Sequence, residues 1–270
     1  MDFGRADRES LREQLLRARI AGEVATPREG NLEHYRRMVA KYPDYQFGLA
    51  LKDWTFEETL DMMARLCGVN PDPGHVRGID TIDPDLTIDA LEAMGARIGE
   101  AAREREAVLL ATGHPAKLMV VYRALEDRLR AAGCAVLTPA AGWSYDADVH
   151  FGSAYREIAY TSGVAALFGD DGLPRHTHDP RPMQAMLREL AATDPGYRPD
   201  LVIADHGWAG AAGEAGIDTV GFADCNDPAL FAGQVEGKIV VAVPLDDGIV
   251  PAEHYAPLIA YLLARAGLGD

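Results

Sequence analysis

The order of hydrophobic and polar positions changes character near residue 105. Before that point, apolar residues recur at helical spacing, which predicts helices over residues 10–22, 30–42, 55–68 and 86–106. Ser10 and Thr55 are each followed three residues later by glutamate, the pattern of a helix capping box. Residues 69–85 are rich in proline and glycine, have no periodicity and are expected to form a loop. Residues 1–100 are therefore expected to form an N-terminal helical lobe that serves as a lid or flank.

From Ala107 onward, short β-branched runs alternate with helical segments. The alternation predicts strands over residues 107–113, 134–140, 199–207, 218–224 and 238–247. Residues 156–176 interrupt it with a hairpin-like segment around Ser162 and Gly163. Alternating strands and helices imply a parallel sheet with crossover connections, so we expect an α/β fold with a doubly wound, mostly parallel sheet of about five strands. Residues 101–270 would form its Rossmann-like catalytic domain.

Composition narrows the class of partner. The formal net charge of −16 argues against broad binding of nucleic acid or anionic membrane, but it leaves room for a small anionic substrate held by a local positive potential. Neither a signal peptide nor an apolar run of membrane-spanning length is expected. The three cysteines, Cys67, Cys134 and Cys225, are widely spaced and are expected to be buried and reduced, which suits a cytoplasmic protein.

Polar side chains follow the carboxyl ends of four predicted strands. In open parallel sheets, ligands bind outside these ends, although each aspartate or asparagine there could also cap a helix. Carboxylate and carbonyl oxygens are the ligands that Mg²⁺ prefers. The expected metal ligands are Asp205, Asp224, Asn226, Asp227 and Asp246.

The turn after the first of these strands has the features of an anion site. Gly113 would let the backbone approach a ligand, and the helix that follows would present free N–H groups. Lys117 lies one turn inside that helix. The turn is not a Walker P-loop. The alternative is that His114 only neighbours the helix cap and that Lys117 is solvated.

Histidines supply the candidate proton carriers. His176 and His178 are two residues apart, so in an extended segment both would point to one side and could bind a metal or act as an acid. Two solvated imidazoles in a surface loop would fit the pattern equally well. His206 is favoured over His178 as the acid because it follows a strand beside Asp205. The expected catalytic residues are His114, His178, His206 and Asp205, and the expected substrate-binding residues are Gly113, Lys117, Arg28, Asn31, Arg175 and His176.

The glycine-rich segment after Asp205 suggests a different function. Its glycines lie at positions 207, 210 and 213, and Asp224 follows at a spacing close to that of a ribose-binding acid. The pattern departs from G-x-G-x-x-G. It keeps open a nucleotide-dependent enzyme as an alternative.

Several segments resemble those of actinobacterial proteins labelled as phosphatases: ATPREGNLEHYRRM, LLATGHP, RHTHDPRPM, VIADHGWAGAAG, GFADCNDPALF and VPLDD. The resemblance covers most of the chain and implies hydrolysis of phosphate esters, but it assigns no catalytic roles. No predicted strand ends in D-x-D-x-[TV], the motif of an aspartyl-phosphate enzyme, and neither C-x₅-R nor R-H-G is found in the sequence.

Together these observations favour a phosphomonoesterase acting on a small phosphorylated metabolite of the sugar-phosphate or amino-alcohol-phosphate type. It would use a divalent cation, Mg²⁺ being the first choice. Residues 26–35, with Arg28, Asn31 and His34, would close over the substrate. We expect no nucleic-acid or membrane partner and allow for a homodimer. A non-catalytic phosphometabolite-binding protein is the second alternative.

Overall fold

The computed structural model describes residues 7–149, 152–248 and 251–269. The first six residues of the predicted lobe, and Asp270 at the end of the predicted catalytic domain, lie outside this part. Within it, the main sheet has nine strands in the order β11-β10-β9-β3-β7-β6-β5, with β4 beside β3 and β8 beside β7. The strands are β3 (Ala107–Ala111), β4 (Ala135–Val136), β5 (Ser144–Val149), β6 (Gly152–Thr161), β7 (Val164–Phe168), β8 (Pro174–Arg175), β9 (Leu201–Ala204), β10 (Asp218–Ala223) and β11 (Val241–Pro244).

The parallel part of the sheet confirms the expected α/β class. Strands β11, β10, β9, β3, β4 and β7 pair in parallel. The antiparallel strands β6 and β5 extend one edge, and β8 pairs with β7 in antiparallel orientation. The expected hairpin at Ser162 and Gly163 is the turn between β6 and β7. Strands in such a sheet are covered on both faces, so they are continuous apolar runs; every residue of β9 is buried.

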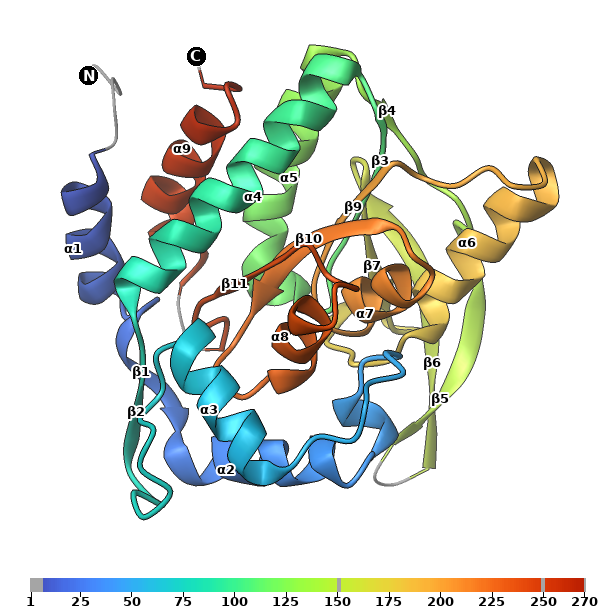
Figure 1. Cartoon of the computed structure of the whole chain (residues 1–270). Coiled ribbons are helices and arrows are strands. Elements are labelled where there is room, and N and C mark those ends of the chain that lie inside the picture. The colour runs from blue at the N-terminus through green and yellow to red at the C-terminus, as the bar shows by residue number, and fades with distance from the viewer. Residues whose placement is uncertain (1–6, 150–151, 249–250, 270) are drawn as a thin grey trace.

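Helices cover both faces of the sheet, as expected for a doubly wound fold (Figure 1). One face carries α4 (Pro84–Glu104), α5 (Pro115–Ala132) and α9 (Ala256–Arg265), which follows a short 3₁₀ turn, η2 (Ala252–Tyr255). The other carries α6 (Arg181–Thr193), α7 (His206–Glu214) and α8 (Pro228–Val235).

Residues 7–83 contain more than the expected helices. They form α1 (Arg8–Ala18), α2 (Arg28–Val39), the 3₁₀ turn η1 (Pro43–Tyr45) and α3 (Phe56–Leu66). They also form a two-stranded antiparallel sheet of β1 (Gly22–Pro27) and β2 (Ile79–Ile82). The capping box at Thr55 is present. The prediction of an uninterrupted loop over 69–85 was wrong, because it contains β2.

The predicted boundaries of the first helix were also wrong. Asp7, not Ser10, caps α1, and the helix ends at Arg19, which has a left-handed backbone conformation. Gly22 then begins β1. Strand β1 is held by contacts with distant residues: the Ala25 N–H donates to Asp246 Oδ2, and the Thr26 hydroxyl donates to Asp224 Oδ2. Local periodicity carries no trace of such contacts.

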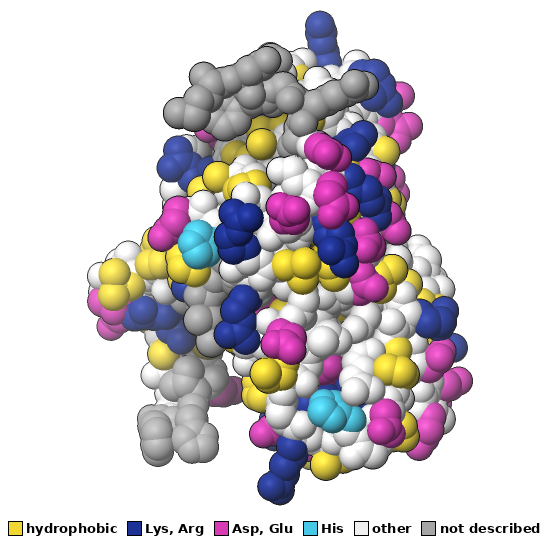
Figure 2. All heavy atoms as spheres, turned by 90° about the vertical axis from the view of Figure 1, so that its left-hand side faces the viewer, with side chains coloured by type: hydrophobic (Ala, Val, Ile, Leu, Met, Phe, Trp, Pro, Cys, Tyr) yellow, Lys and Arg dark blue, Asp and Glu magenta, His cyan; other side chains and the backbone are white. Residues whose placement is uncertain are grey.

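Charges are mixed on the face formed by α1 and the β1–β2 sheet. Figure 2 shows arginine and lysine side chains there beside aspartate and glutamate side chains. Arg8 and Arg12 of α1, for example, pair with Asp85 at the start of α4. The three cysteines are buried free thiols, as expected. Among the described residues, no helix combines the length and the apolar character needed to cross a membrane.

The direction of winding changes at β3. The chain leaves β3 through α5 and reaches β4 on one side of it, whereas β9 pairs with β3 on the other side. The helices after β3 and β9, α5 and α7, lie on opposite faces of the sheet (Figure 1). The carboxyl ends of β3 and β9 therefore meet at a topological switch point, which is where open α/β sheets bind their ligands.

Candidate active site

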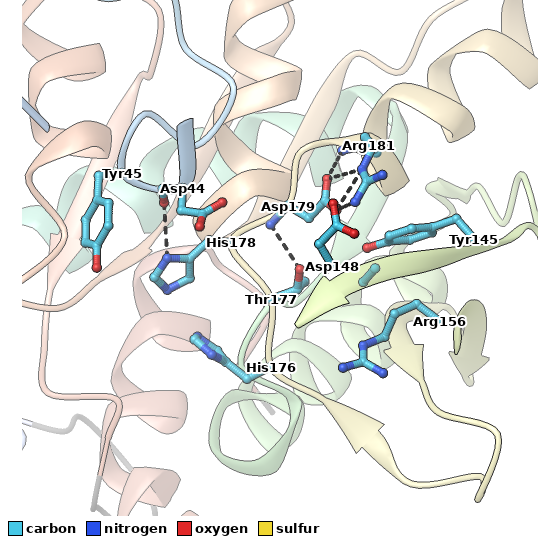
Figure 3. A pocket seen from close by; sticks show the side chains of 11 residues that line it. Asp44, Tyr45, Tyr145, Asp148, Arg156, His176, Thr177, His178, Asp179 and Arg181 are labelled. Atoms are coloured by element: carbon cyan, nitrogen blue, oxygen red, sulfur yellow. Dashed lines mark hydrogen bonds and ion pairs between the residues drawn. The ribbon is translucent and has the colours of Figure 1, made fainter. Parts of the chain in front are cut away.

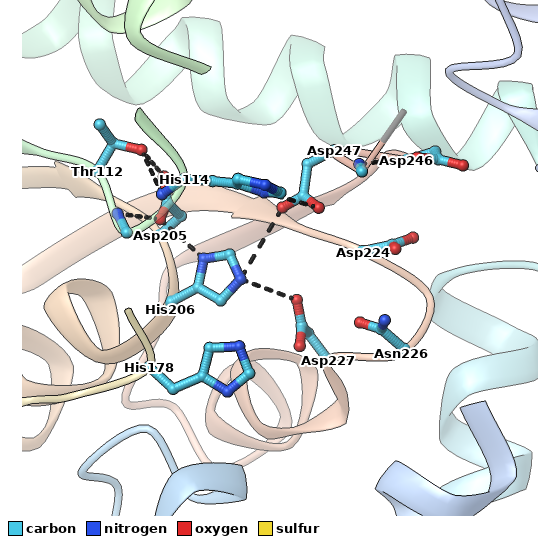
Figure 4. A network of polar contacts seen from close by, with 12 residues as sticks. Thr112, His114, His178, Asp205, His206, Asp224, Asn226, Asp227, Asp246 and Asp247 are labelled. Carbon is cyan, nitrogen blue, oxygen red and sulfur yellow. Dashed lines mark hydrogen bonds and ion pairs between the residues drawn. The ribbon is translucent and has the colours of Figure 1, made fainter. Parts of the chain in front are cut away.

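Four imidazoles converge at this switch point. The His206 ring, at the start of α7, lies 5.9 Å from the ring of His114, 5.1 Å from that of His176 and 5.0 Å from that of His178, measured between centroids. Three buried carboxylates adjoin these rings. We call the seven residues the histidine–aspartate cluster: His114, His176, His178, His206, Asp205, Asp227 and Asp247. Figure 4 shows all of them except His176, which Figure 3 shows.

Asp205 is a fully buried acceptor that orients His206. Its Oδ2 accepts from the Thr112 hydroxyl at 2.7 Å, and its Oδ1 accepts from the Gly113 N–H at 2.6 Å. The same Oδ1 lies 2.8 Å from His206 Nδ1, so a carboxylate there assigns the proton to Nδ1. His206 also has a left-handed backbone conformation (φ 48°), which is strained for a residue with a side chain and is typical of functional sites.

The other nitrogen of His206 faces two more carboxylates. His206 Nε2 lies 3.4 Å from Asp227 Oδ2 and 4.0 Å from Asp247 Oδ2, and Asp247 Oδ1 lies 3.1 Å from His114 Nδ1 (Figure 4). Asp205 and Asp227 both occupy helix N-cap positions, but neither side chain makes a capping hydrogen bond. Capping therefore does not explain these two carboxylates.

Burial and neighbouring charges set the protonation of His206, His114 and Asp227. Burial opposes a charge on His206, but Asp227, Asp205 and Asp247 outweigh it and raise its pKa to about 10. For His114, the Asp247 carboxylate 3.1 Å from Nδ1 likewise outweighs burial and raises the pKa. Burial raises the pKa of Asp227 to about 6 even though the positive charge of His206 opposes the change.

His176 and His178 form the more open half of the cluster. The ring of His178 stacks on His206 at an interplanar angle of 23°, and its Nδ1 lies 3.1 Å from the carbonyl oxygen of Asp44. Desolvation, followed by the charge of the neighbouring imidazoles, lowers the pKa of His178 to about 2 and that of His176 to about 4. Both are therefore neutral near pH 7. His176 is an exposed residue whose ring lies against the other three.

A cavity of about 540 Å³ opens beside these two histidines (Figure 3). The hairpin of β5 and β6 supplies Tyr145, Asp148 and Arg156 to its lining. The start of α6 supplies Arg181, whose guanidinium lies over the Tyr145 ring at 4.3 Å. The remaining lining residues are Asp44, Tyr45, Ala147, His176, Thr177, His178 and Asp179.

Three of the five expected oxygen ligands have other contacts in the structure. Asp224 accepts from the Thr26 hydroxyl and from the Cys225 N–H, both at 2.6 Å, and burial raises its pKa well above the usual value. Asp246 accepts from the N–H groups of Ala25 and Gly248. The carbonyl of Asn226 contacts His34 Nδ1 at 3.0 Å. Asp205 and Asp227 are the two expected ligands that belong to the cluster.

Arg28 and Asn31, the expected lid residues, are fully buried beside β2. Arg28 Nη1 forms an ion pair with Asp80 at 3.0 Å, and Arg28 also donates to two backbone carbonyls. Asn31 Nδ2 donates to the same Asp80 carboxylate and to Cys225 Sγ. These contacts anchor α2 to the rest of the protein.

Two other side chains expected to bind phosphate, Lys117 and Arg175, have different surroundings from the cluster. Lys117 lines a separate surface pocket along α5, together with Met119 and Arg123. Arg175 forms an ion pair with Asp171 at 2.5 Å. Binding of phosphate by either side chain stays a prediction.

Glycines bring the histidine-bearing segments together. A methyl group at Gly113 would lie 2.5 Å from the carbonyl oxygen of Thr177, and one at Gly207 would lie 2.2 Å from that of His178. Gly210 similarly admits the backbone of Phe47, whose ring packs against His178 and His206. The glycine pattern after Asp205 therefore reflects close packing of α7 and gives no support to a nucleotide cradle.

Sequence analysis did not single out several residues of the site. Asp246 and Asp247 both follow β11. Sequence analysis located this strand end but chose Asp246 as the site residue, whereas Asp247 is the one that belongs to the cluster. Thr112 lies in the turn that was identified, yet its hydrogen bond to Asp205 depends on the pairing of β3 with β9. The cavity residues Tyr145, Arg156 and Arg181 carried no local signal.

Comparison with known proteins identifies the family of the chain. A family model described as "Phosphatase" matches residues 6–270. The chain is also 46% identical over 267 residues to the Streptomyces coelicolor protein named "Phosphatase SCO2771", and the match covers 98% of each chain. The chain therefore belongs to this phosphatase family, and it is a phosphatase, an enzyme that acts on phosphate-containing substrates.

Proposed function

We propose that this phosphatase hydrolyses a small phosphorylated metabolite, a phosphate monoester of the sugar-phosphate or amino-alcohol-phosphate type. The observation that carries the proposal is the convergence of four imidazoles and three carboxylates at a topological switch point, beside a cavity of about 540 Å³. Hydrolysis of a phosphate monoester requires stabilisation of charge on the phosphoryl oxygens and a proton for the departing oxygen. The cluster holds groups suited to both tasks.

The four imidazoles differ in what they can do. His206 is 3% exposed, and its two nitrogens face Asp205 and Asp227, so it is placed to hold charge at the inner end of the site. His176 is exposed and lines the cavity. We assign proton donation to His176, because the negative charge of a bound phosphate would favour its protonated form. Asp205 is a positioning residue that acts through His206.

The lining of the cavity supports a small and polar organic group. Its volume falls within the range typical of small-ligand sites, roughly 300–1,000 Å³. Arg156, Arg181 and Asp148 line it with the hydroxyl of Tyr145, groups that can hydrogen-bond to hydroxyl or amino substituents.

A phosphate-release screen tests the proposal. The panel contains p-nitrophenyl phosphate, sugar phosphates, phosphoethanolamine and the diester bis(p-nitrophenyl) phosphate. We expect hydrolysis of monoesters, a preference for small polar ones, and no release from the diester. Turnover of the diester at the rate of the monoesters, or binding of every ester without turnover, would contradict the proposal. The second outcome would favour the phosphometabolite-binding alternative.

A matched pair of variants tests the role of His176. His176→Asn should lower turnover of an alkyl phosphate by about 10²–10⁴-fold, the range for a lost general acid. The loss should be much smaller for p-nitrophenyl phosphate, because its leaving group needs little protonation. His75→Asn, in the loop before β2, is the control. Equal losses for both substrates would remove His176 from proton transfer.

A cytoplasmic location and a homodimer belong to the same proposal. The cytoplasmic location rests on the reduced cysteines. The homodimer rests on the sequence alone. Light scattering coupled to size-exclusion chromatography tests the homodimer through the mass of the particle in solution.

A further inference from the structure

We propose that His178, His206 and Asp227 bind one divalent transition-metal ion, such as Zn²⁺ or Mn²⁺, through two imidazole nitrogens and one carboxylate oxygen. One potential ligand atom from each of the three residues lies within 4.8 Å of those of the other two. The inference rests on the proposed function for its role in catalysis, but metal binding can be measured without any activity.

The hydrogen bonds of both histidines leave Nε2 free for a metal. His206 Nδ1 faces Asp205 Oδ1 at 2.8 Å, and His178 Nδ1 faces the carbonyl oxygen of Asp44 at 3.1 Å. Each acceptor holds a proton on Nδ1, so Nε2 is the atom that can bind a metal; on His206, which is protonated in the absence of a metal, the ion would displace the Nε2 proton. Metal-binding histidines typically have this arrangement, with a carboxylate or backbone carbonyl behind the ring. Asp205, the carboxylate behind the His206 ring, is itself held in place by hydrogen bonds from Thr112 and Gly113.

The charge around the cluster calls for a cation. Asp205, Asp227 and Asp247 are all at most 4% exposed. In the part of the chain that the structure describes, their ion-pair partners are the imidazoles of His114 and His206, not lysine or arginine. Among the described residues, Asp247 Oδ2, which is buried 4.0 Å from His206 Nε2, has no hydrogen-bond partner. Buried carboxylates are costly unless they are paired or coordinate a metal.

The ligand types point to a transition metal more than to Mg²⁺. Imidazole suits Zn²⁺ and its neighbours in the first transition row, whereas Mg²⁺ prefers oxygen ligands and its own waters. An oxygen-only site would need Asp224 and Asp246. Both oxygens of each of these carboxylates already accept hydrogen bonds that hold β1 and the adjoining loops. Within the described part of the chain, the contacts that hold the two imidazoles are made by Nδ1, and Nε2 of His206 faces the Asp227 carboxylate.

A second group of potential ligand atoms, from His114, His176 and His206, shares His206 with the first. We assign the ion to the first group because Asp227 adds a carboxylate and His176 remains free to face the cavity. An ion there would neutralise charge on the phosphoryl oxygens, as metal ions do in many phosphatases.

The test uses metal alone on the full chain after removal of metals by a chelator. Isothermal titration with Zn²⁺, Mn²⁺ and Mg²⁺, and the visible absorption of Co²⁺, report binding and imidazole ligation directly. The variants are His178→Ala, Asp227→Asn and Asp224→Asn, with His75→Ala as the matched histidine control. Circular dichroism checks that each variant is folded. If His178→Ala does not fold, Asp227→Asn still tests the site, because this change keeps the size of the side chain.

We expect one ion per chain, with Mg²⁺ the weakest. Loss of a residue that only hydrogen-bonds to a metal ligand typically weakens metal binding by about 10–100-fold. His178→Ala and Asp227→Asn should each weaken it by more than this, whereas Asp224→Asn and His75→Ala should leave it unchanged. Tighter binding of Mg²⁺ with loss in Asp224→Asn alone would replace this site with an oxygen-rich one. No binding of any ion would overturn the inference. Neither result depends on phosphate release, so failure here is distinguishable from failure of the proposed function.

Discussion

The packing of α7 against the segment of His178 makes Gly207→Ala an informative change. The new methyl group would lie 2.2 Å from the carbonyl oxygen of His178 and 2.5 Å from the carbonyl carbon of Asp179. Both are backbone atoms, so relief requires movement of the chain that carries His176 and His178.

Two opposing terms set the magnitude. Alanine gains roughly 0.5–1 kcal/mol over glycine within a helix. Overpacking costs about 1–3 kcal/mol, and a rigid backbone neighbour argues for the upper end of that range. The expected result is a loss of about 1–2 kcal/mol in the free energy of unfolding. A displacement of about 1 Å at His176 and His178, the histidines proposed for the active site, can also cost on the order of 100-fold in turnover.

Urea denaturation and turnover of p-nitrophenyl phosphate measure the two effects. Gly30→Ala is the matched control for stability, because Gly30 is also helical and its new methyl group would meet only a side-chain carbon of Pro27, at 3.7 Å. Gly30→Ala should gain the stability that alanine has over glycine within a helix, and it should not suffer a clash. If Gly207→Ala is as stable as Gly30→Ala and retains full turnover, the packing argument is wrong.

Two further predictions concern buried and exposed ion pairs. Asp80→Asn should lower the free energy of unfolding by about 3–5 kcal/mol in urea, because it leaves Arg28 buried without its counter-charge; a change below 1 kcal/mol would contradict a structural role for the pair. At Asp85, the hydrogen bond from Arg12 outweighs slight burial and lowers the carboxyl pKa below its usual value of 3.8. The stability advantage of wild type over Asp85→Asn should therefore be small, present above about pH 4 and lost as the pH falls below it; an advantage that grows on acidification would reverse the sign.

The part of the fold that sequence predicted well is the part whose signal is local. The strands from β3 to β11 that are buried on both faces are uninterrupted apolar runs, and amphipathic helices separate them. Strands β1 and β2 have no such pattern, because side chains of Asp224 and Asp246 from distant parts of the chain hold β1 in place.

The candidate site shows the same limit at finer scale. The carboxyl ends of parallel strands could be located, and so could the histidines that lie there. Which neighbour faces the cluster could not be predicted: Asp246 binds the backbone of β1, whereas the adjacent Asp247 faces His114. Arg28 and Lys117 look equally suitable for phosphate in the sequence, and only tertiary contacts distinguish their surroundings.

The most direct test of the central claim is a crystal structure of the enzyme with orthovanadate, which mimics the transferring phosphoryl group. The account predicts vanadate within the histidine–aspartate cluster, in contact with His176 and facing the cavity that Arg156 and Arg181 line. Vanadate bound instead beside Lys117 on α5, or at Arg28 and Asn31, with the cluster unchanged, would contradict the claim that hydrolysis takes place among these histidines.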